Sequence, residues 1–159
     1  EARRLYRLGD AGALVVKGTS ASPWPGNPPP RLVETPAGLL NSIGLENKGV
    51  EWLKRECLPE LRAEGLKVIV NVVGATSREY REVAESLVDQ DILALELNVS
   101  CPNVEMDVEF GEDPVALRGL LEEVRRGSRH PLIVKLTPNV GFRRIADLAR
   151  AAEDGGGHR

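Results

Sequence analysis

The sequence predicts an α/β fold with a parallel sheet, and three observations support this prediction. Four apolar segments of strand length occur along the 159 residues, at 12–18, 67–74, 92–101 and 131–138. Amphipathic helical patterns lie between them, and strands that alternate with helices form βαβ units with parallel strands. Each apolar segment also carries one polar residue near its C-terminal end, where parallel α/β folds bind their ligands.

Segment 77–90 is predicted to be a helix. Thr76 and Glu79 have the spacing of a capping box, in which each residue satisfies a free amide of the first turn. Apolar residues then recur at helical spacing and form one stripe. This stripe consists of Tyr80, Val83, Ala84, Leu87 and Val88.

Three further helices are predicted. One is capped by Asp113, has Pro114 in its first turn and ends at Gly127. Its apolar stripe is Leu117, Leu120, Leu121 and Val124. The stripe of the last helix is Ile145, Leu148, Ala149 and Ala152. A weaker helix covers 49–64, and Pro59 is expected to distort it.

Composition excludes several function classes. The net charge is −3 and the basic residues are scattered, so no nucleic-acid partner is indicated. Two cysteines and two histidines give no disulfide framework and no zinc-ligand spacing, so no metal site is predicted. No apolar run approaches the roughly 18 residues of a membrane span, and we expect a reducing, cytoplasmic location.

The late polar residues of the four segments are Lys17, Asn71, Asn98 and Lys135. Side chains alternate across a strand, so each points away from the neighbouring apolar positions. Since parallel strands end at the same edge of a sheet, the four are predicted to form one site. The alternative is that each simply reaches solvent at its strand end.

The loop at 19–47 is predicted to be an ordered lid. It holds six of the eleven prolines, shows no convincing periodicity, and is longer than the usual connection. Near its end, Asn41 offers both a donor and an acceptor. Gly44 would let the backbone approach a flat ligand closely.

The residue types limit the chemistry of such a site. Asparagine amides can read the paired N–H and C=O groups of a cyclic amide, and lysines can hold an anion. Cys101 follows the third strand, where a thiol could act as a nucleophile or general base. A small buried apolar role is the alternative for Cys101 and is our interpretation of Cys57.

Several motifs occur together and in order: GNPPPR, NSIGL, VNVVG, NVSCPNV, FGEDP and VKLTPNV. In this combination the chain resembles the class 1 dihydroorotate dehydrogenases, and most of all their class 1B branch. The resemblance extends from about Gly12 to Ala152. The related dihydropyrimidine dehydrogenases share a similar Asn-x-Ser-Cys-Pro strand end, but the continuation through Val104 and the GNPPPR loop favour the dihydroorotate enzymes.

The resemblance implies a TIM-barrel flavoprotein that oxidises dihydroorotate to orotate in pyrimidine synthesis. It implies that Cys101 is the catalytic base. The implied FMN-binding residues are Lys17, Gly18, Asn71, Asn98 and Lys135. The implied substrate-binding residues are Lys17, Asn41, Ser42, Ile43, Gly44, Leu45, Asn98 and Asn103. A homo-oligomer is also implied, together with an iron–sulfur, FAD-containing partner subunit that passes electrons to NAD.

The resemblance also implies an incomplete barrel. The family barrel has eight strands, and the four predicted here would be its second to fifth, in a single domain at 1–159. We therefore expect a fragment that is inactive alone. The residues leave three alternatives open: a dihydropyrimidine dehydrogenase-like flavoenzyme, a Schiff-base lyase using Lys17 or Lys135, and a non-catalytic half-barrel remnant.

Overall fold

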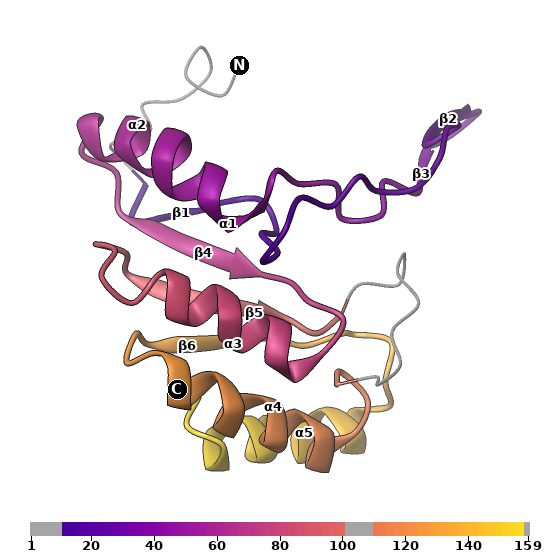
Figure 1. The fold of residues 1–159 in the computed structure, drawn as a ribbon. Coiled ribbons are helices and arrows are strands. Elements are labelled where there is room, and N and C mark those ends of the chain that lie inside the picture. Colours follow the sequence, from indigo (N-terminus) through magenta and orange to yellow (C-terminus); the bar gives the residue numbers. More distant parts are fainter. Residues whose placement is uncertain (1–10, 101–109, 158–159) are drawn as a thin grey trace.

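The predicted parallel sheet is present in the computed structural model, which describes residues 11–100 and 110–157. The sheet has four strands in the order β1-β4-β5-β6, and all adjacent pairs are parallel (Figure 1). The strands are β1 (Leu14–Val15), β4 (Val68–Val72), β5 (Ala94–Asn98) and β6 (Leu132–Lys135). Strands and helices alternate along this sheet, so the predicted α/β class is confirmed.

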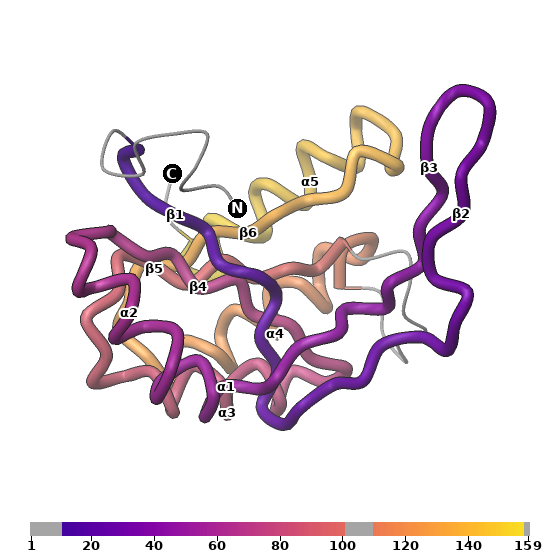
Figure 2. The backbone as a smooth tube through the Cα atoms, turned by 90° about the horizontal axis from the view of Figure 1, so that it is seen from above, coloured from indigo at the N-terminus to yellow at the C-terminus, as the bar shows by residue number. Residues whose placement is uncertain are grey.

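The core lies between one face of the sheet and the helices. In β4 the side chains of Val68, Val70 and Val72 are almost completely buried, and Leu95 and Leu97 continue this layer on β5. Seen from above in Figure 2, α1 (Gly49–Trp52), α2 (Leu58–Ala63) and α3 (Ser77–Ser86) lie on one side of these strands. The intervening residues of each strand point to the opposite face, which carries the polar side chains.

Helix α3 begins as its capping signals predict. The Thr76 hydroxyl accepts a hydrogen bond from the Glu79 amide at 3.3 Å. The Glu79 carboxylate accepts from the Ala75 amide at 2.8 Å, one residue earlier than in the standard capping box. The helix ends at Ser86, so Val88 lies beyond it and is 48% exposed. Its predicted place in the buried stripe was wrong.

The segment after the long loop is helical but irregular. Between α1 and α2 the chain forms a π-helical turn, η3 (Leu53–Cys57), in which the Leu58 amide donates to the Leu53 carbonyl. Pro59 has no amide hydrogen for the usual bond to the fourth residue before it, so the regular ladder cannot run through this point. The predicted distortion is therefore present, on the N-terminal side of Pro59.

Helices α4 (Pro114–Gly127) and α5 (Phe142–Asp154) pack against each other. The Asp113 carboxylate caps α4 by accepting from the Val115 amide at 2.8 Å. All four residues of its predicted stripe are buried. In α5 only part of the predicted stripe is covered: Leu148 is buried, whereas Ala149 is exposed. The prediction that Ala149 packs inside was wrong for the described part of the chain.

The long loop contains a β-hairpin that the sequence analysis missed. Strands β2 (Leu32–Thr35) and β3 (Gly38–Asn41) pair antiparallel and stand away from the rest of the chain (Figures 1 and 2). The hairpin buries neither face, so its sequence does not need the alternation of polar and apolar residues that would have predicted two strands. Four of its apolar side chains are more than half exposed: Leu32, Val33, Leu39 and Leu40.

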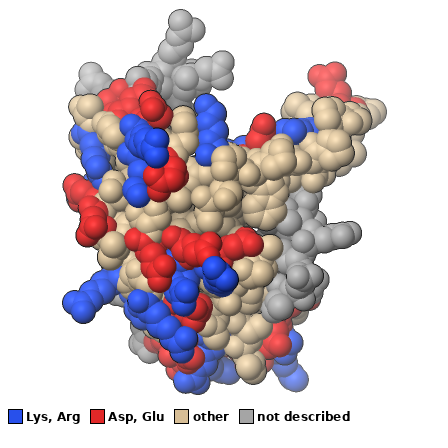
Figure 3. Space-filling view, in the orientation of Figure 1, with Lys and Arg blue, Asp and Glu red and all other residues tan. Residues whose placement is uncertain are grey.

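Charges of both signs are interspersed on the surface. In the view of Figure 3, blue and red residues alternate over the helices, while the area beside the hairpin is largely uncharged. Ion pairs such as Arg81–Glu123 at 2.6 Å link neighbouring helices. Within residues 11–100 and 110–157, no helix has the length and hydropathy to cross a bilayer, and no three metal-binding side chains come together.

Candidate active site at the carboxyl ends of the strands

Two buried asparagines form the centre of the candidate site. Asn71 ends the polar face of β4 and Asn98 ends β5, and each is only 6% exposed. The Asn98 amide donates to the Asn71 carbonyl oxygen at 3.4 Å, which is a long contact. The Ser100 hydroxyl donates to Asn98 Oδ1 at 3.3 Å. We call this hydrogen-bonded series of side chains at the strand ends the strand-end row. The structure thus brings together the two asparagines that the sequence placed on neighbouring strands.

The sequence analysis missed a carboxylate in this row. Glu96 pairs with Asn71 across β4 and β5, and Asn71 Nδ2 donates to Glu96 Oε1 at 2.5 Å. Glu96 lies two residues before Asn98 and therefore points to the same face of the sheet. This parity is visible in the sequence LELN, and it would have identified Glu96 as a member of the site.

Lys17 and Gly18 lie beside the asparagines at the end of β1. A Cβ atom on Gly18 would come within 3.1 Å of Asn71 Oδ1 and 3.0 Å of a Val73 methyl group. The small residue therefore keeps the backbone close to Asn71. Lys17 is exposed, and alternation from Val15 places its side chain on the polar face.

Lys135 reaches the same row from β6. Its Cα is paired with that of Asn98 in the parallel register, and its side chain is exposed. Four strands thus contribute Lys17, Asn71, Asn98 and Lys135 to one edge of one face. The predicted convergence of these residues is present in the structure.

In the turn at 41–45, the backbone lies close to another part of the same loop. Gly44 has φ +71°, and a Cβ there would lie 2.5 Å from Asn27 Oδ1. The space beside Gly44 is therefore filled by Asn27 and is not open to a flat ligand. Leu45 has φ +57°, and its side chain is the third neighbour of the Gly18 position, at 3.8 Å. The end of this turn thus meets the start of the strand-end row.

The first part of the turn is held by the opposite limb of the loop. The Asn27 amide donates to the Ser42 hydroxyl at 2.8 Å, and the Asn27 backbone donates to the Ile43 carbonyl at 3.1 Å. Asn41 is exposed at the base of the hairpin. Within the described ranges, no recorded hydrogen bond joins Asn41 or Ser42 to the strand-end row. The structure therefore orders these residues without bringing them onto the asparagines.

Cys101 and Asn103 lie outside the described residues, but the chain on either side is fixed. Tyr80 is fully buried, and its hydroxyl donates to the Asn98 carbonyl at 2.8 Å. Its ring packs edge-on against Phe110, with centroids 6.1 Å apart. Gly111 lies so close to Val99 that a Cβ would overlap the Val99 carbonyl oxygen. Val99 and Gly111, which are described, therefore lie in direct contact.

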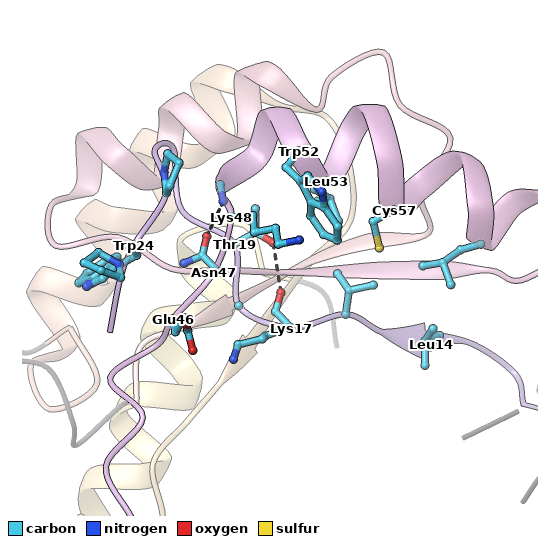
Figure 4. Close-up of a pocket in the computed structure, with 16 residues that line it drawn as sticks. Leu14, Lys17, Thr19, Trp24, Glu46, Asn47, Lys48, Trp52, Leu53 and Cys57 are labelled. Atoms are coloured by element: carbon cyan, nitrogen blue, oxygen red, sulfur yellow. Dashed lines mark hydrogen bonds between the residues drawn. The ribbon is translucent and has the colours of Figure 1, made fainter. Parts of the chain in front are cut away.

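A pocket of about 840 Å³ lies on the helix side of β1, apart from the two asparagines. Figure 4 shows Trp52, Leu53 and Cys57 reaching toward β1 from the helical segment above it. Asn71, Asn98 and Lys135 do not line this pocket, although Lys17 borders it. Burial raises the pKa of the half-buried Cys57 thiol, with a smaller contribution from Glu60. This supports our interpretation of Cys57 as an unreactive apolar residue.

A family profile described as "Dihydroorotate dehydrogenase" matches residues 1–156. The chain belongs to the dihydroorotate dehydrogenase family. A protein of Lachnoclostridium phytofermentans named "Dihydroorotate dehydrogenase B (NAD(+)), catalytic subunit" is 47% identical over 150 residues, which are 94% of this chain and 49% of that protein. A relative of the same name from Alkaliphilus oremlandii gives the same figures.

One relative in this dihydroorotate dehydrogenase family carries a different name. "Putative dihydroorotate dehydrogenase A (fumarate)" of Aquifex aeolicus is 48% identical over 142 residues, or 88% of this chain and 46% of that protein. The chain thus spans about half the length of the relatives it matches. Its four parallel strands and intervening helices are part of the barrel of this dehydrogenase family.

The strand-end row suits the flavin that the resemblance implies for dihydroorotate dehydrogenases. Most polar atoms along one edge of a flavin ring are acceptors, namely carbonyl oxygens and unprotonated ring nitrogens, and these need donors. Asn71 and Asn98 each have a second amide hydrogen beyond the bonds already described, and exposed lysines follow on the strands to either side. Gly18 itself adds no side chain beside Asn71, where a Cβ atom would lie 3.1 Å from Asn71 Oδ1. The residues present are therefore compatible with a flavin ring.

Proposed function

We propose that this chain forms part of an enzyme that oxidises dihydroorotate to orotate with FMN in pyrimidine synthesis. One observation carries the proposal: two buried asparagines are hydrogen-bonded to each other at the strand ends, and Asn98 is the first residue of the NVSCPNV segment. Buried amides of this kind are expensive unless they are paired, so their unused donors need a polar ligand. Family membership supports oxidation of dihydroorotate over a Schiff-base lyase.

The proposed reaction removes two hydrogens from adjacent ring carbons. Cys101 takes one as a proton, and the carbon–hydrogen electron pair left behind forms the new ring double bond. FMN supplies the acceptor for the other hydrogen, which leaves the neighbouring carbon with its electron pair as hydride. Cys101 suits the base role because a thiol titrates near 8.5, and a modest shift makes it effective near neutral pH.

The remaining residues are proposed to bind and orient FMN and dihydroorotate. Lys17 supplies a cation to both ligands, with Gly18 beside it, and Lys135 supplies one to FMN. Asn71 donates to FMN, and Asn98 donates to both ligands. The proposed substrate turn is Asn41, Ser42, Ile43, Gly44 and Leu45, with Asn103 as a further contact. The strained Leu45 backbone, next to Gly18, is the described part of this turn that lies nearest the row.

The electron acceptor is part of the proposal. Relatives named as NAD(+) catalytic subunits support NAD as the acceptor and a separate second subunit. That this subunit contains an iron–sulfur cluster and FAD is proposed from the resemblance alone. The relative named with fumarate indicates the competing acceptor. We infer a cytoplasmic homo-oligomer that works with such a subunit. Purified full-length protein should then reduce NAD only when this subunit is added, and fumarate-dependent turnover without it would contradict the assignment.

The test of the proposed reaction is orotate formation. Full-length protein supplied with dihydroorotate and an artificial electron acceptor should produce orotate, measured by its ultraviolet absorbance. Dihydrouracil lacks the carboxylate that Lys17 would hold, and it serves as the matched control substrate. Equal turnover of dihydrouracil would favour a dihydropyrimidine dehydrogenase-like enzyme and would contradict the proposal.

A further inference from the structure

We propose that Glu96 is a positioning residue that fixes which atoms of Asn71 and Asn98 face the bound ligand. The side chain of Glu96 lies below Asn98 on the polar face of β5, toward the start of the strand. Its carboxylate contacts Asn71, one of the residues that are proposed to bind the ligand, so Glu96 can act on the ligand through Asn71. The inference rests on the proposed function only for the identity of the ligand as FMN.

The argument begins with the chemistry of the short contact. An ionised carboxylate can only accept hydrogen bonds, whereas an asparagine amide has a donating end and an accepting end. The atom of Asn71 that lies 2.5 Å from Glu96 Oε1 must therefore be its nitrogen. A bond to a charged group is also stronger than one between neutral groups. Glu96 thus fixes the orientation of the Asn71 amide.

The fixed orientation of the Asn71 amide also determines the orientation of Asn98 on β5. With its nitrogen held by Glu96, Asn71 directs its oxygen to the Asn98 amide nitrogen, 3.4 Å away. Asn98 in turn directs its oxygen toward the Ser100 hydroxyl at 3.3 Å. All three bonds run in the same sense, toward the carboxylate, and aligned bonds of this kind reinforce one another. Reversing the first would require the others to reverse or break.

The consequence is a site that presents donors. One hydrogen of each amide nitrogen is used within the row, so the second hydrogen of Asn71 and of Asn98 remains for a ligand. Two lysines at the same strand ends add further donors. A ring whose edge carries acceptor oxygens and nitrogens matches this arrangement.

The decisive experiment compares Glu96→Gln with the wild type in full-length protein. Glutamine keeps the size of the side chain but can also donate, so the Asn71 amide loses its enforced orientation. We expect FMN to bind about 10-fold more weakly, measured by quenching of flavin fluorescence, since one charged hydrogen bond no longer holds the donor in place. Glu82→Gln on the exposed face of α3 removes the same charge and should leave FMN affinity unchanged.

A double-mutant cycle tests whether Glu96 acts through Asn71. In an Asn71→Ala background, Glu96→Gln should weaken FMN binding by less than about 2-fold, because the amide that it positions is absent. An equal loss in both backgrounds would overturn the proposal, and so would an unchanged affinity in Glu96→Gln alone. Glu96→Asp keeps an acceptor-only group and should bind FMN better than Glu96→Gln. The opposite ranking would also overturn it.

A readout without flavin separates this inference from the proposed function. In apo protein labelled with ¹⁵N-asparagine, Glu96→Gln should shift the side-chain amide signals of both Asn71 and Asn98, and Glu82→Gln should shift neither. Unchanged signals would overturn the positioning role. If the signals move but wild-type protein does not oxidise dihydroorotate, Glu96 still orients the row and the proposed function has failed.

Discussion

The hydroxyl of Tyr80 donates to the backbone carbonyl of Asn98 at 2.8 Å, and it joins helix α3 to the end of β5. Tyr80 is fully buried, and its ring also packs against Phe110, which follows the segment that holds Cys101. One side chain therefore contacts the chain just before and just after this segment. The strand end that presents Asn98 is held from behind by a helix that carries no ligand-binding residue of its own.

Tyr80→Phe should lower stability and slow flavin reduction together. The variant keeps the ring contact with Phe110 but leaves the Asn98 carbonyl unpaired, at a cost of about 1–3 kcal/mol in the free energy of unfolding. Thermal melting measures the first effect and stopped-flow flavin reduction the second. Leu120→Ala on α4 is the control, since it removes buried volume without removing a hydrogen bond to the strand ends and should affect melting alone. Reduction at the wild-type rate in Tyr80→Phe would show that this bond only stabilises the fold.

The two lysines should differ in what they bind. Lys17→Ala is expected to weaken both FMN and orotate by about 10-fold, and Lys135→Ala mainly FMN, since a charged hydrogen bond contributes about 1.5–3 kcal/mol. Fluorescence titration of each ligand measures both constants. Lys54→Ala, which removes a partly buried lysine paired with Glu51 at 3.1 Å, should change neither. Wild-type affinities in both strand-end variants would mean that these lysines merely reach solvent.

Cys57 should react slowly with alkylating reagents. Its raised pKa lowers the fraction of reactive thiolate at neutral pH, so its labelling rate should still be rising at a pH where an ordinary thiol has levelled off. Mass spectrometry of iodoacetamide-treated protein over a pH series measures this. In denaturant the same cysteine should label at the rate of a free thiol. Rapid labelling of folded protein at pH 7 would contradict the burial seen in the structure.

The 159-residue chain alone should bind FMN weakly or not at all. Within the described residues, β1 and β6 each pair on one side only, and Val15 on the polar face of β1 is 46% exposed. Open parallel edges and a half-covered face favour self-association. Gel filtration and the flavin absorbance of the purified chain test this. A yellow, monomeric preparation with a sharp melting transition would contradict it.

Much of the fold was predictable because its signals are local. Apolar runs gave the four strands, and Asp113 and Thr76 marked helix starts that the structure confirms. The hairpin at 32–41 escaped because both its faces are exposed, so no alternation of polar and apolar residues was required. Val88 and Ala149 were misplaced because periodicity alone cannot show where a helix ends or which neighbour covers it.

The site was predictable to the extent that strand parity determines it. Side chains alternate along a strand, and this alternation placed Asn71 and Asn98 on one face. The same rule would have placed Glu96, two residues before Asn98, on that face. The bond from Asn71 to Glu96 depends on the register between β4 and β5, which no single strand encodes. Likewise, Gly44 suggested a close approach, but only the folded loop shows that Asn27 is the neighbour.

The most direct test of the proposed chemistry is the anaerobic bleaching of FMN in full-length protein. Mixed with dihydroorotate in a stopped-flow instrument, wild-type protein should lose its flavin absorbance in a single turnover. Cys101→Ala should keep FMN bound yet bleach about 10²–10⁴-fold more slowly, which is the usual contribution of a general base. Cys101→Ser should recover part of this rate at high pH. Bleaching of Cys101→Ala at the wild-type rate, or no bleaching of the wild type by dihydroorotate, would contradict the account.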